Sequence, residues 1–260
     1  MNRIILLAFI ILFPFLSTAF AQADSSLKGK RILIVYGGWE GHEPRQTVEV
    51  FLPWLKAEGA LVDTTSNLGV YADRTYMSTV DLIIQNVSSS TLSHDQERGL
   101  LAAVKGGVGL AGWHGGLGSS FYQNVRFHYM VGGQWVAHPG NIIDYEVIIT
   151  DTNDPLLKGI SKSFHLKSEQ YYMHVDPNVK VLATTTFSGK HDDWIDGTTM
   201  PVVWKKTYGK GRVFYSSLGH VAADFQVPEV LEIMKRGIVW AAQSRYQPFE
   251  EWVSPVYPNN

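Results

Sequence analysis

The stretch that most constrains the fold is Gly106-Gly107-Val108-Gly109-Leu110-Ala111-Gly112-Trp113-His114-Gly115-Gly116. Its apolar run, residues 108–113, predicts a buried strand that ends at a histidine between glycines. The pattern Gly-x-His-x-Gly has the form of a nucleophile elbow, with His114 in the position of the usual serine. Ligands of open α/β sheets bind at the carboxyl ends of parallel strands. Two interpretations are open: a strained elbow that presents His114 to a ligand, or a glycine-rich turn beside a core histidine.

Apolar runs and helical patterns alternate before this stretch. Strands are predicted at residues 31–36, 61–64 and 81–86. One helix is predicted after Pro44, and another after Ser93, where Gln96 completes a capping box. The order strand, helix, strand, strand, helix, strand predicts an α/β fold with a doubly wound, mostly parallel sheet and helices on both faces.

The second half of the chain has a different pattern. Strands are predicted at residues 142–150, 179–185, 202–206 and 212–217, the last two as a hairpin around the glycine turn at 208–211. A final helix is predicted from Pro228 to Trp240. The sequence therefore predicts an added β-rich region, closed by a helix.

The N-terminus has the pattern of a secretory signal peptide. A positive charge at Arg3 precedes the apolar residues 4–15, and an Ala-x-Ala site ends at Ala21. A transmembrane anchor is the alternative, but the apolar stretch is short and contains Pro14. We expect a signal peptide over residues 1–21, cleaved near Ala21, and no stable membrane insertion afterwards.

Four segments follow from this interpretation: the signal peptide 1–21, a linker 22–30, one domain over 31–242 and a C-terminal tail 243–260. The chain has no cysteine, which excludes a disulfide framework, a cysteine-linked lipid anchor and cysteine catalysis. We expect a bacterial protein that is periplasmic or secreted.

Composition and motifs exclude several classes of function. The net charge is −2 and only 18% of residues are charged, so no nucleic-acid partner is expected. No P-loop occurs, and the glycines at positions 37, 38 and 41 lack the spacing of a dinucleotide-binding fingerprint, so no nucleotide cofactor is expected. The chain also lacks the Gly-x-Ser-x-Gly elbow of serine hydrolases.

The histidines are the candidate functional residues. His42, His114 and His220 each follow an apolar run assigned to the sheet, and His138 lies in a glycine-rich loop. If the strands are parallel, the histidines that follow them converge on one edge. With a carboxylate they can hold a divalent metal ion such as zinc, for which we name His42, His114, His138 and His220 as candidate ligands.

Proton transfer is the other chemistry open to these residues. A neutral imidazole can act as general base or polarise a carbonyl group. Glu169, in a segment rich in tyrosine, is the candidate partner, although a surface carboxylate in a loop is the simpler interpretation. The candidate catalytic residues are His114, Glu169, His42, His138 and His220.

Aromatic side chains are candidates for contacts with a ligand. The chain has eight tryptophans and twelve tyrosines, which suit the apolar faces of sugar rings but suit a protein core equally well. We name Trp39, Trp113, Tyr171 and Arg212 as candidate substrate-binding residues, while Arg212 has the alternative of pairing a carboxylate structurally.

The same segments resemble the ThuA-like (trehalose utilisation) family over roughly residues 31–242. The matching pieces are Gly41-His42, Gly-Leu-Ala-Gly-Trp-His114, Gly-Gly-Gln-Trp-Val-Ala-His138-Pro139, Ser-Glu169-Gln-Tyr171, Pro201-Val-Val-Trp204, Tyr208-Gly-Lys-Gly-Arg212 and Leu-Gly-His220. The resemblance implies a flavodoxin-like fold of the class I glutamine amidotransferase-like type. Because His114 takes the nucleophile position, amidotransferase activity is not expected.

The resemblance also implies a role in bacterial sugar metabolism, particularly that of 3-keto-glycosides. The favoured hypothesis is an exported carbohydrate-active enzyme, a lyase, hydrolase or isomerase that uses His/Glu acid–base chemistry, with or without a divalent metal. The alternative is a non-catalytic periplasmic sugar-binding protein on a degenerate amidotransferase fold. The expected partner is a small-molecule carbohydrate, and homo-oligomerisation through Trp39, Trp54 or Trp135 stays open.

Overall fold

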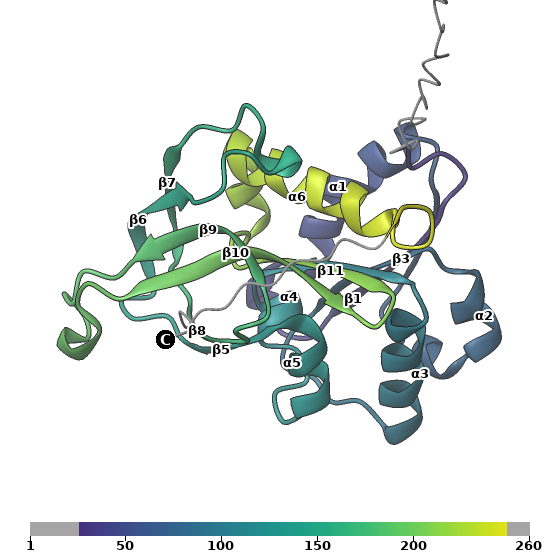
Figure 1. Cartoon of the computed structure of the whole chain (residues 1–260). Helices are drawn as coiled ribbons and strands as arrows, with labels where there is room; N and C mark the ends of the chain where they lie inside the picture. The colour runs from purple at the N-terminus through teal and green to yellow at the C-terminus, as the bar shows by residue number, and fades with distance from the viewer. Residues whose placement is uncertain (1–25, 249–260) are drawn as a thin grey trace, which may run out of the picture.

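The apolar runs predicted as strands form a nine-stranded sheet in the computed structural model, which describes residues 26–248 (Figure 1). The predicted signal peptide 1–21, the linker residues 22–25 and the tail residues 249–260 lie outside the described residues.

Half of the sheet is parallel. Its strands are β1 (Arg31–Gly37), β2 (Leu61–Thr65), β3 (Leu82–Val87), β4 (Gly109–Trp113) and β11 (Gly211–Ser216). They lie side by side in the order β2-β1-β3-β4-β11, and every neighbouring pair is parallel. This is the 2-1-3-4-5 order of flavodoxin-like folds, which confirms the predicted fold class.

The other half of the sheet is antiparallel and forms the predicted β-rich region. It adds β10 (Thr199–Tyr208), β9 (Lys180–Thr186), β6 (Ile142–Ile149) and β7 (Ser163–Glu169), in that order, beyond β11. The predicted hairpin is present, with Tyr208 opposite Gly211 at its turn. A separate pair of strands, β5 (Gly133–Ala137) and β8 (Tyr172–Val175), is antiparallel.

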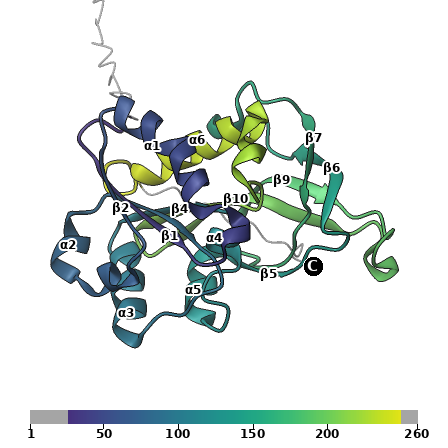
Figure 2. The same ribbon diagram turned by 180° about the vertical axis from the view of Figure 1, so that it is seen from behind.

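Helices cover both faces of the parallel half (Figures 1 and 2). One face carries α1 (Pro44–Ala57) and α6 (Pro228–Ala242), and the other carries α2 (Arg74–Thr79), α3 (His94–Lys105), α4 (His114–Gly118) and α5 (Val125–Val131). The predicted capping box starts α3, because Ser93 and Gln96 each accept a hydrogen bond from the other's backbone N–H. Short 3-10 helices lie at Glu40–His42, Leu68–Ala72, Pro155–Leu157, Asp193–Ile195 and Ala222–Gln226.

The hydrophobic core is divided into two layers by the sheet. Successive residues of β1 point to opposite faces, so Ile32 and Ile34 pack with α1 and α6, while Leu33 and Val35 pack with α2, α3 and α5. Strands buried on both sides in this way have the continuous apolar runs that made the parallel half visible in the sequence.

Several elements were not predicted, among them α2, β5, β7 and β8. The connection between β2 and β3 contains α2, only six residues long, so its helical pattern is too short to recognise. Strand β7 was also missed, although Phe164 and Leu166 are buried and alternate with exposed residues. Glu169 therefore ends a strand instead of lying in a surface loop.

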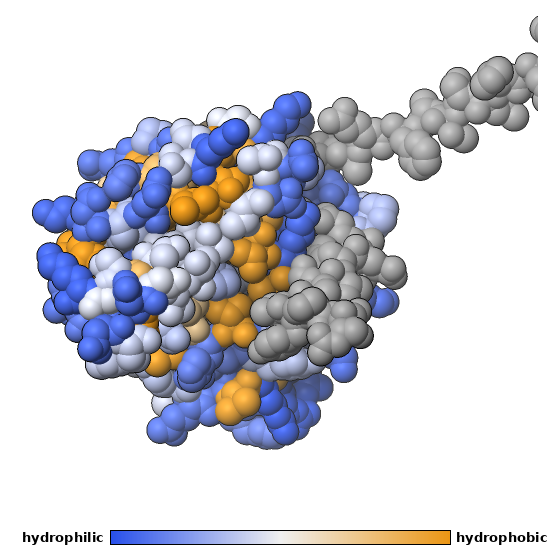
Figure 3. Space-filling view, turned by 60° about the vertical axis from the view of Figure 1, so that its left-hand side comes forward, coloured by the Kyte–Doolittle hydropathy of each residue, from blue (hydrophilic) through white to orange (hydrophobic). Residues whose placement is uncertain are grey.

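The surface around the antiparallel half mixes apolar and hydrophilic residues (Figure 3). Of the three tryptophans considered for a dimer contact, only Trp39 is exposed, and Trp54 and Trp135 are half-buried. Homo-oligomerisation stays a prediction. Within residues 26–248, no helix combines the length and apolar character that crossing a bilayer requires.

Candidate active site at the carboxyl edge of the sheet

His114 occupies a strained turn between β4 and α4. Trp113 is extended, with φ −138° and ψ 158°, and His114 then adopts a φ of 44°, in the left-handed region that non-glycine residues rarely enter. A Cβ atom at Gly115 would lie 2.2 Å from Cε1 of His42, so this glycine allows the two segments to approach. The geometry favours the elbow over a simple glycine-rich turn.

The strain at His114 predicts a stability difference between two variants that both lack the imidazole. Glycine adopts a φ of 44° without penalty, whereas alanine keeps the Cβ that disfavours it. We expect the free energy of unfolding of His114→Gly to exceed that of His114→Ala by about 1 kcal/mol in urea titrations. An alanine variant as stable as the glycine variant would contradict a strained elbow.

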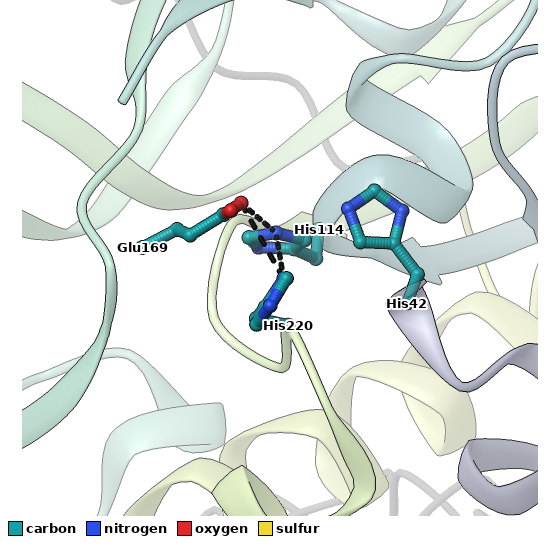
Figure 4. Close-up of side chains that lie close together, drawn as sticks. All are labelled: His42, His114, Glu169 and His220. Carbon is teal, nitrogen blue, oxygen red and sulfur yellow. Dashed lines mark hydrogen bonds and ion pairs between the residues drawn. The ribbon is translucent and has the colours of Figure 1, made fainter. Parts of the chain in front are cut away.

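Four side chains from distant parts of the chain meet at this elbow (Figure 4). Nε2 of His114 lies 3.0 Å from Oε2 of Glu169. Nδ1 of His220 lies 3.2 Å from Nε2 of His114 and 3.4 Å from Oε2 of Glu169. His42 completes a buried group in which one nitrogen or oxygen of each residue lies within 4.8 Å of the others.

The topology explains why these residues meet. His42 follows β1, His114 follows β4 and His220 follows β11, and these parallel strands have their carboxyl ends at one edge. Glu169 reaches the same place from the end of β7, on the antiparallel side. The structure thus brings together three of the four predicted histidines and the predicted carboxylate.

His138, the fourth predicted histidine, lies at the outer side of the cluster. Its Nε2 is 3.8 Å from Oε1 of Glu169, the oxygen that does not face His114, and its side chain is 29% exposed. Its ring stacks on Trp135 at 5.4 Å between ring centroids. His138 is not among the four residues whose ligand atoms lie within 4.8 Å of one another, so it is better placed as a contact to solvent than as a fourth ligand.

Backbone and aromatic groups fix the orientation of His114. Its Nδ1 donates to the carbonyl oxygen of Ser217 at 2.8 Å, so Nε2 is the nitrogen that faces Glu169. The ring of Tyr171 packs against that of His114 at 3.9 Å between centroids. Because His114 is 1% exposed, these contacts leave its imidazole one orientation.

Two carboxylates tie the loop of His220 to the segments that carry the other cluster residues. Oδ2 of Asp224 accepts from the backbone N–H of His220 at 2.8 Å and from the hydroxyl of Ser168, next to Glu169, at 2.6 Å. Oε2 of Glu43, next to His42, accepts from the backbone N–H of Ala222 at 3.0 Å. The two carboxylates therefore act as positioning groups for the cluster.

Asp224 offers a stability prediction that separates charge from geometry. Asp224→Ala leaves the buried Ser168 hydroxyl and the His220 N–H without an acceptor, so we expect a loss of about 2 kcal/mol in the free energy of unfolding. In Asp224→Asn the amide oxygen can accept both hydrogen bonds, and the expected loss is below about 1 kcal/mol. Urea unfolding of both variants measures the difference, and equal losses would show that the two hydrogen bonds are not what holds this loop.

The electrostatics keep the members of the cluster in different protonation states. Burial and the neighbouring His114 and His220 lower the pKa of His42 to about 3. Burial and His114 also lower the pKa of His220. Burial alone would raise the pKa of Glu169, but its hydrogen bond to His114 and its electrostatic interactions with His114, His220 and His138 lower it to about 2. At neutral pH the site therefore combines the anionic carboxylate of Glu169 with neutral imidazoles at His42 and His220.

The candidate substrate-binding residues fall into two groups. Trp39 is 54% exposed and lies edge-on to His42 at 4.7 Å, and Tyr171 packs beneath His114, so both belong to the site. Trp113 is a core residue against Phe51, and this packing turns it away from any ligand. The position of Trp113 in an apolar strand already favoured a place in the core over contact with a ligand.

Arg212 lies away from the cluster. It is the second residue of β11, at the end opposite to the loop of His220, and donates to the carbonyl oxygens of Trp240 and Pro248 and to the side chain of Gln247. The structure therefore places Arg212 in a structural role, with carbonyl and amide oxygens among its acceptors.

Sequence reasoning missed the residues that position the cluster: Glu43, Trp135, Ser217 and Asp224. Glu43 and Asp224 lie within four residues of His42 and His220, and this proximity was the only signal available. The contacts of both carboxylates are to backbone N–H groups and a serine, which have no sequence pattern of their own.

Solved structures with the same architecture support the assignment of the fold. A ThuA-like protein from Bacteroides uniformis superposes with a TM-score of 0.69 at 17% identity, over 89% of this chain and 96% of that one. A ThuA-like protein from Parabacteroides merdae gives 0.68 at 18% identity, over 86% and 93%. A cytoplasmic protein from Salmonella typhimurium gives 0.58 at 14% identity, over 82% and 98%. A search of curated proteins gave no match.

Fold and site together define a flavodoxin-like α/β protein with a histidine–carboxylate cluster at the carboxyl edge of its sheet. The sequence profile of the ThuA family, described as trehalose utilisation, matches residues 31–241. The chain belongs to the ThuA-like family, as the resemblance of its segments predicted.

Proposed function

We propose that this protein is an exported carbohydrate-active enzyme that acts on 3-keto-glycosides through acid–base chemistry of the His114–Glu169 cluster. The observation that carries the proposal is the 3.0 Å contact between His114 Nε2 and Glu169 Oε2, buried at the edge where α/β folds bind ligands. The name of the family, trehalose utilisation, supports a carbohydrate as the ligand.

A 3-keto sugar suits a site of this kind. The ketone acidifies the neighbouring C2–H bond, so a base removes that proton and leaves an enolate. The electron pair then forms the C1–C2 double bond and expels the aglycone from C1, and an acid protonates the departing oxygen. Such a reaction needs a base, an acid and a donor for the enolate oxygen within one pocket.

The cluster supplies these groups. Glu169 shares its carboxylate between His114 on one oxygen and His138 on the other. A proton taken up at the buried end therefore has a route to solvent through His138, whose side chain is 29% exposed. The imidazoles of His42 and His220 stay neutral because their pKa values are lowered, and they are available as proton acceptors at neutral pH.

Trp39 provides a binding surface for the sugar. Its side chain is 54% exposed and its ring lies 4.7 Å from that of His42 and 6.4 Å from that of His220, so a sugar that covers the indole has its ring atoms next to the cluster. An aromatic face of this kind suits the apolar face of a pyranose.

The experiment uses the mature protein and matched glycosides in D2O. The 3-keto-glycoside is expected to release its aglycone and leave a sugar with a C1–C2 double bond and no hydrogen at C2. Unreacted keto-glycoside is expected to take up deuterium at C2 when its enolate is reprotonated. NMR and mass spectrometry follow both changes, and the parent glycoside with a hydroxyl at C3 is expected to be inert. Binding of the keto-glycoside without exchange or release would favour the alternative, a non-catalytic sugar-binding protein. Fractionation of the native host tests export, for which we expect the protein outside the cytoplasm and shortened near Ala21.

A further inference from the structure

We propose that His114, His220 and Glu169 bind one divalent transition-metal ion, with His42 facing its fourth coordination position. The ligand atoms are Nε2 of His114, Nδ1 of His220 and Oε2 of Glu169. The inference rests on the proposed function for the metal's role, but it makes a claim about binding that is tested separately.

Hydrogen bonds alone do not satisfy the three atoms. They touch pairwise, at 3.0, 3.2 and 3.4 Å. A ring nitrogen carries either a hydrogen or a lone pair in its plane, and a carboxylate oxygen only accepts. If both nitrogens carry hydrogens, two donors face each other; if either lacks one, its lone pair faces the carboxylate. A cation between the three atoms removes this conflict.

The spacing is that of a metal site. Ligand atoms about 2.0–2.1 Å from a tetrahedral zinc ion are roughly 3.3–3.4 Å from one another. The three separations of 3.0 to 3.4 Å are close to this edge length, so an ion enters with small side-chain shifts. His42 stands further off in Figure 4, within the 4.8 Å limit of the group. Three protein ligands and one open position are typical of catalytic metal sites.

The surroundings of the ligands support the same conclusion. Metal-binding histidines usually donate their other ring N–H to a backbone carbonyl or a carboxylate, which fixes the tautomer. His114 does this toward the carbonyl oxygen of Ser217 at 2.8 Å. Nδ1 of His42 is a buried polar atom without a hydrogen-bond partner among the described residues. Hydrogen bonding among the described residues therefore does not account for the burial of this nitrogen.

The donor set selects the class of metal. Imidazole nitrogens with one carboxylate suit zinc, iron, nickel or copper, whereas calcium and magnesium prefer oxygen ligands. Such an ion would polarise a ketone oxygen and stabilise an enolate as a Lewis acid. With His114, His220 and Glu169 as its ligands, proton transfer in the metal-bound protein would fall to His42 and His138.

Elemental analysis and metal titration test the proposal. Mature protein purified without a histidine tag and without chelator is expected to hold about one transition-metal ion per chain. The metal-free protein is expected to bind Co²⁺, with a visible absorption spectrum of low-symmetry coordination. His114→Ala and Glu169→Gln are expected to weaken Co²⁺ binding by more than about 100-fold, since changes outside the ligand shell already cost 10–100-fold.

A surface pair provides the control. His165 Nδ1 lies 2.8 Å from Oδ1 of Asp144 on the exposed side of β6 and β7, so His165→Ala removes a histidine–carboxylate pair that does not belong to the cluster. Its metal content and Co²⁺ affinity are expected to equal those of the wild type. Circular dichroism checks that each variant is folded, and His220→Asn replaces His114→Ala if the latter does not fold.

The outcomes separate this proposal from the proposed function. The metal site is wrong if the purified wild-type protein holds no metal and binds Co²⁺ no more tightly than the His114→Ala and Glu169→Gln variants do. If that metal-free protein still turns over a keto-glycoside, the proposed function stands. Stoichiometric metal that the cluster variants lose supports the site, even if no glycoside is turned over.

Discussion

Replacing His114 by alanine is expected to lower kcat/KM on a 3-keto-glycoside by roughly 10²–10⁴-fold, the range contributed by a positioned acid–base group. The loss is large because His114 contacts both Glu169 and His220, so its removal takes away the group that both of them touch. Steady-state kinetics with aglycone release as the signal measure the change.

The exposed His165 gives the matched control for this substitution. It also pairs with a carboxylate, that of Asp144, but lies outside the cluster, so His165→Ala is expected to keep wild-type kinetics. A His114→Ala variant that is folded and turns over the substrate within a factor of about three of the wild type would remove His114 from the chemistry.

Acid is expected to destabilise the protein through His42. The folded state holds the pKa of His42 at about 3, below the unfolded value of about 6.5, so between these pH values only the unfolded state binds the proton. Stability therefore falls as the pH drops from 6.5 toward 3, by about 1.4 kcal/mol for each pH unit from this proton alone. The total amounts to several kcal/mol.

Other members of the cluster change stability in the same direction. The pKa of His220 is also lowered by burial and by His114. Glu169, whose pKa is lowered to about 2 although burial opposes this, contributes stability above its unfolded pKa that is lost as the pH falls through the range of about 4.5 to 2. His42, His220 and Glu169 therefore all favour lower stability in acid, and the expected profile falls steadily.

The variant His42→Gln tests the assignment. It removes the titrating group, and the slope of the unfolding free energy between pH 6.5 and 4 is expected to decrease by about 1.4 kcal/mol per pH unit. Urea titrations are carried out with chelator present, so that metal release does not add to the slope. An unchanged slope would mean that His42 takes up its proton equally in both states.

The parallel half of the fold was predictable because burial on two faces leaves a direct trace in the sequence. Residues 32–36 and 82–84 are apolar without interruption, and the glycines around His114 mark a sharp turn at which two segments approach closely. The capping box at Ser93 added a local signal whose mechanism is known. These features were enough to predict the family and to place the candidate site at the carboxyl edge of the sheet.

The site was predictable only in part. The histidines after the strands converge because parallel topology forces them to, and this follows from strand order. The place of Glu169 depends on β7, a missed strand, and the separation of His138 from the other histidines depends on packing against Trp135. Arg212 and Trp113 were named for their residue types, and which way a side chain points depends on register, which single-sequence patterns do not set.

The positioning groups lie beyond the reach of sequence patterns. Asp224 acts through a backbone N–H and through the hydroxyl of Ser168, 56 residues away in the chain. Such contacts arise only when loops from both halves of the sheet come together. The residues that orient a site are therefore harder to predict than those that form it.

The most direct test of a single working cluster is a double-mutant cycle in kcat/KM with wild type, His114→Ala, Glu169→Gln and the double variant. Because His114 Nε2 and Glu169 Oε2 are 3.0 Å apart and act together, the double variant is expected to be no slower than the slower single variant. Losses that multiply, as for independent sites, would contradict the claim that the two residues form one site.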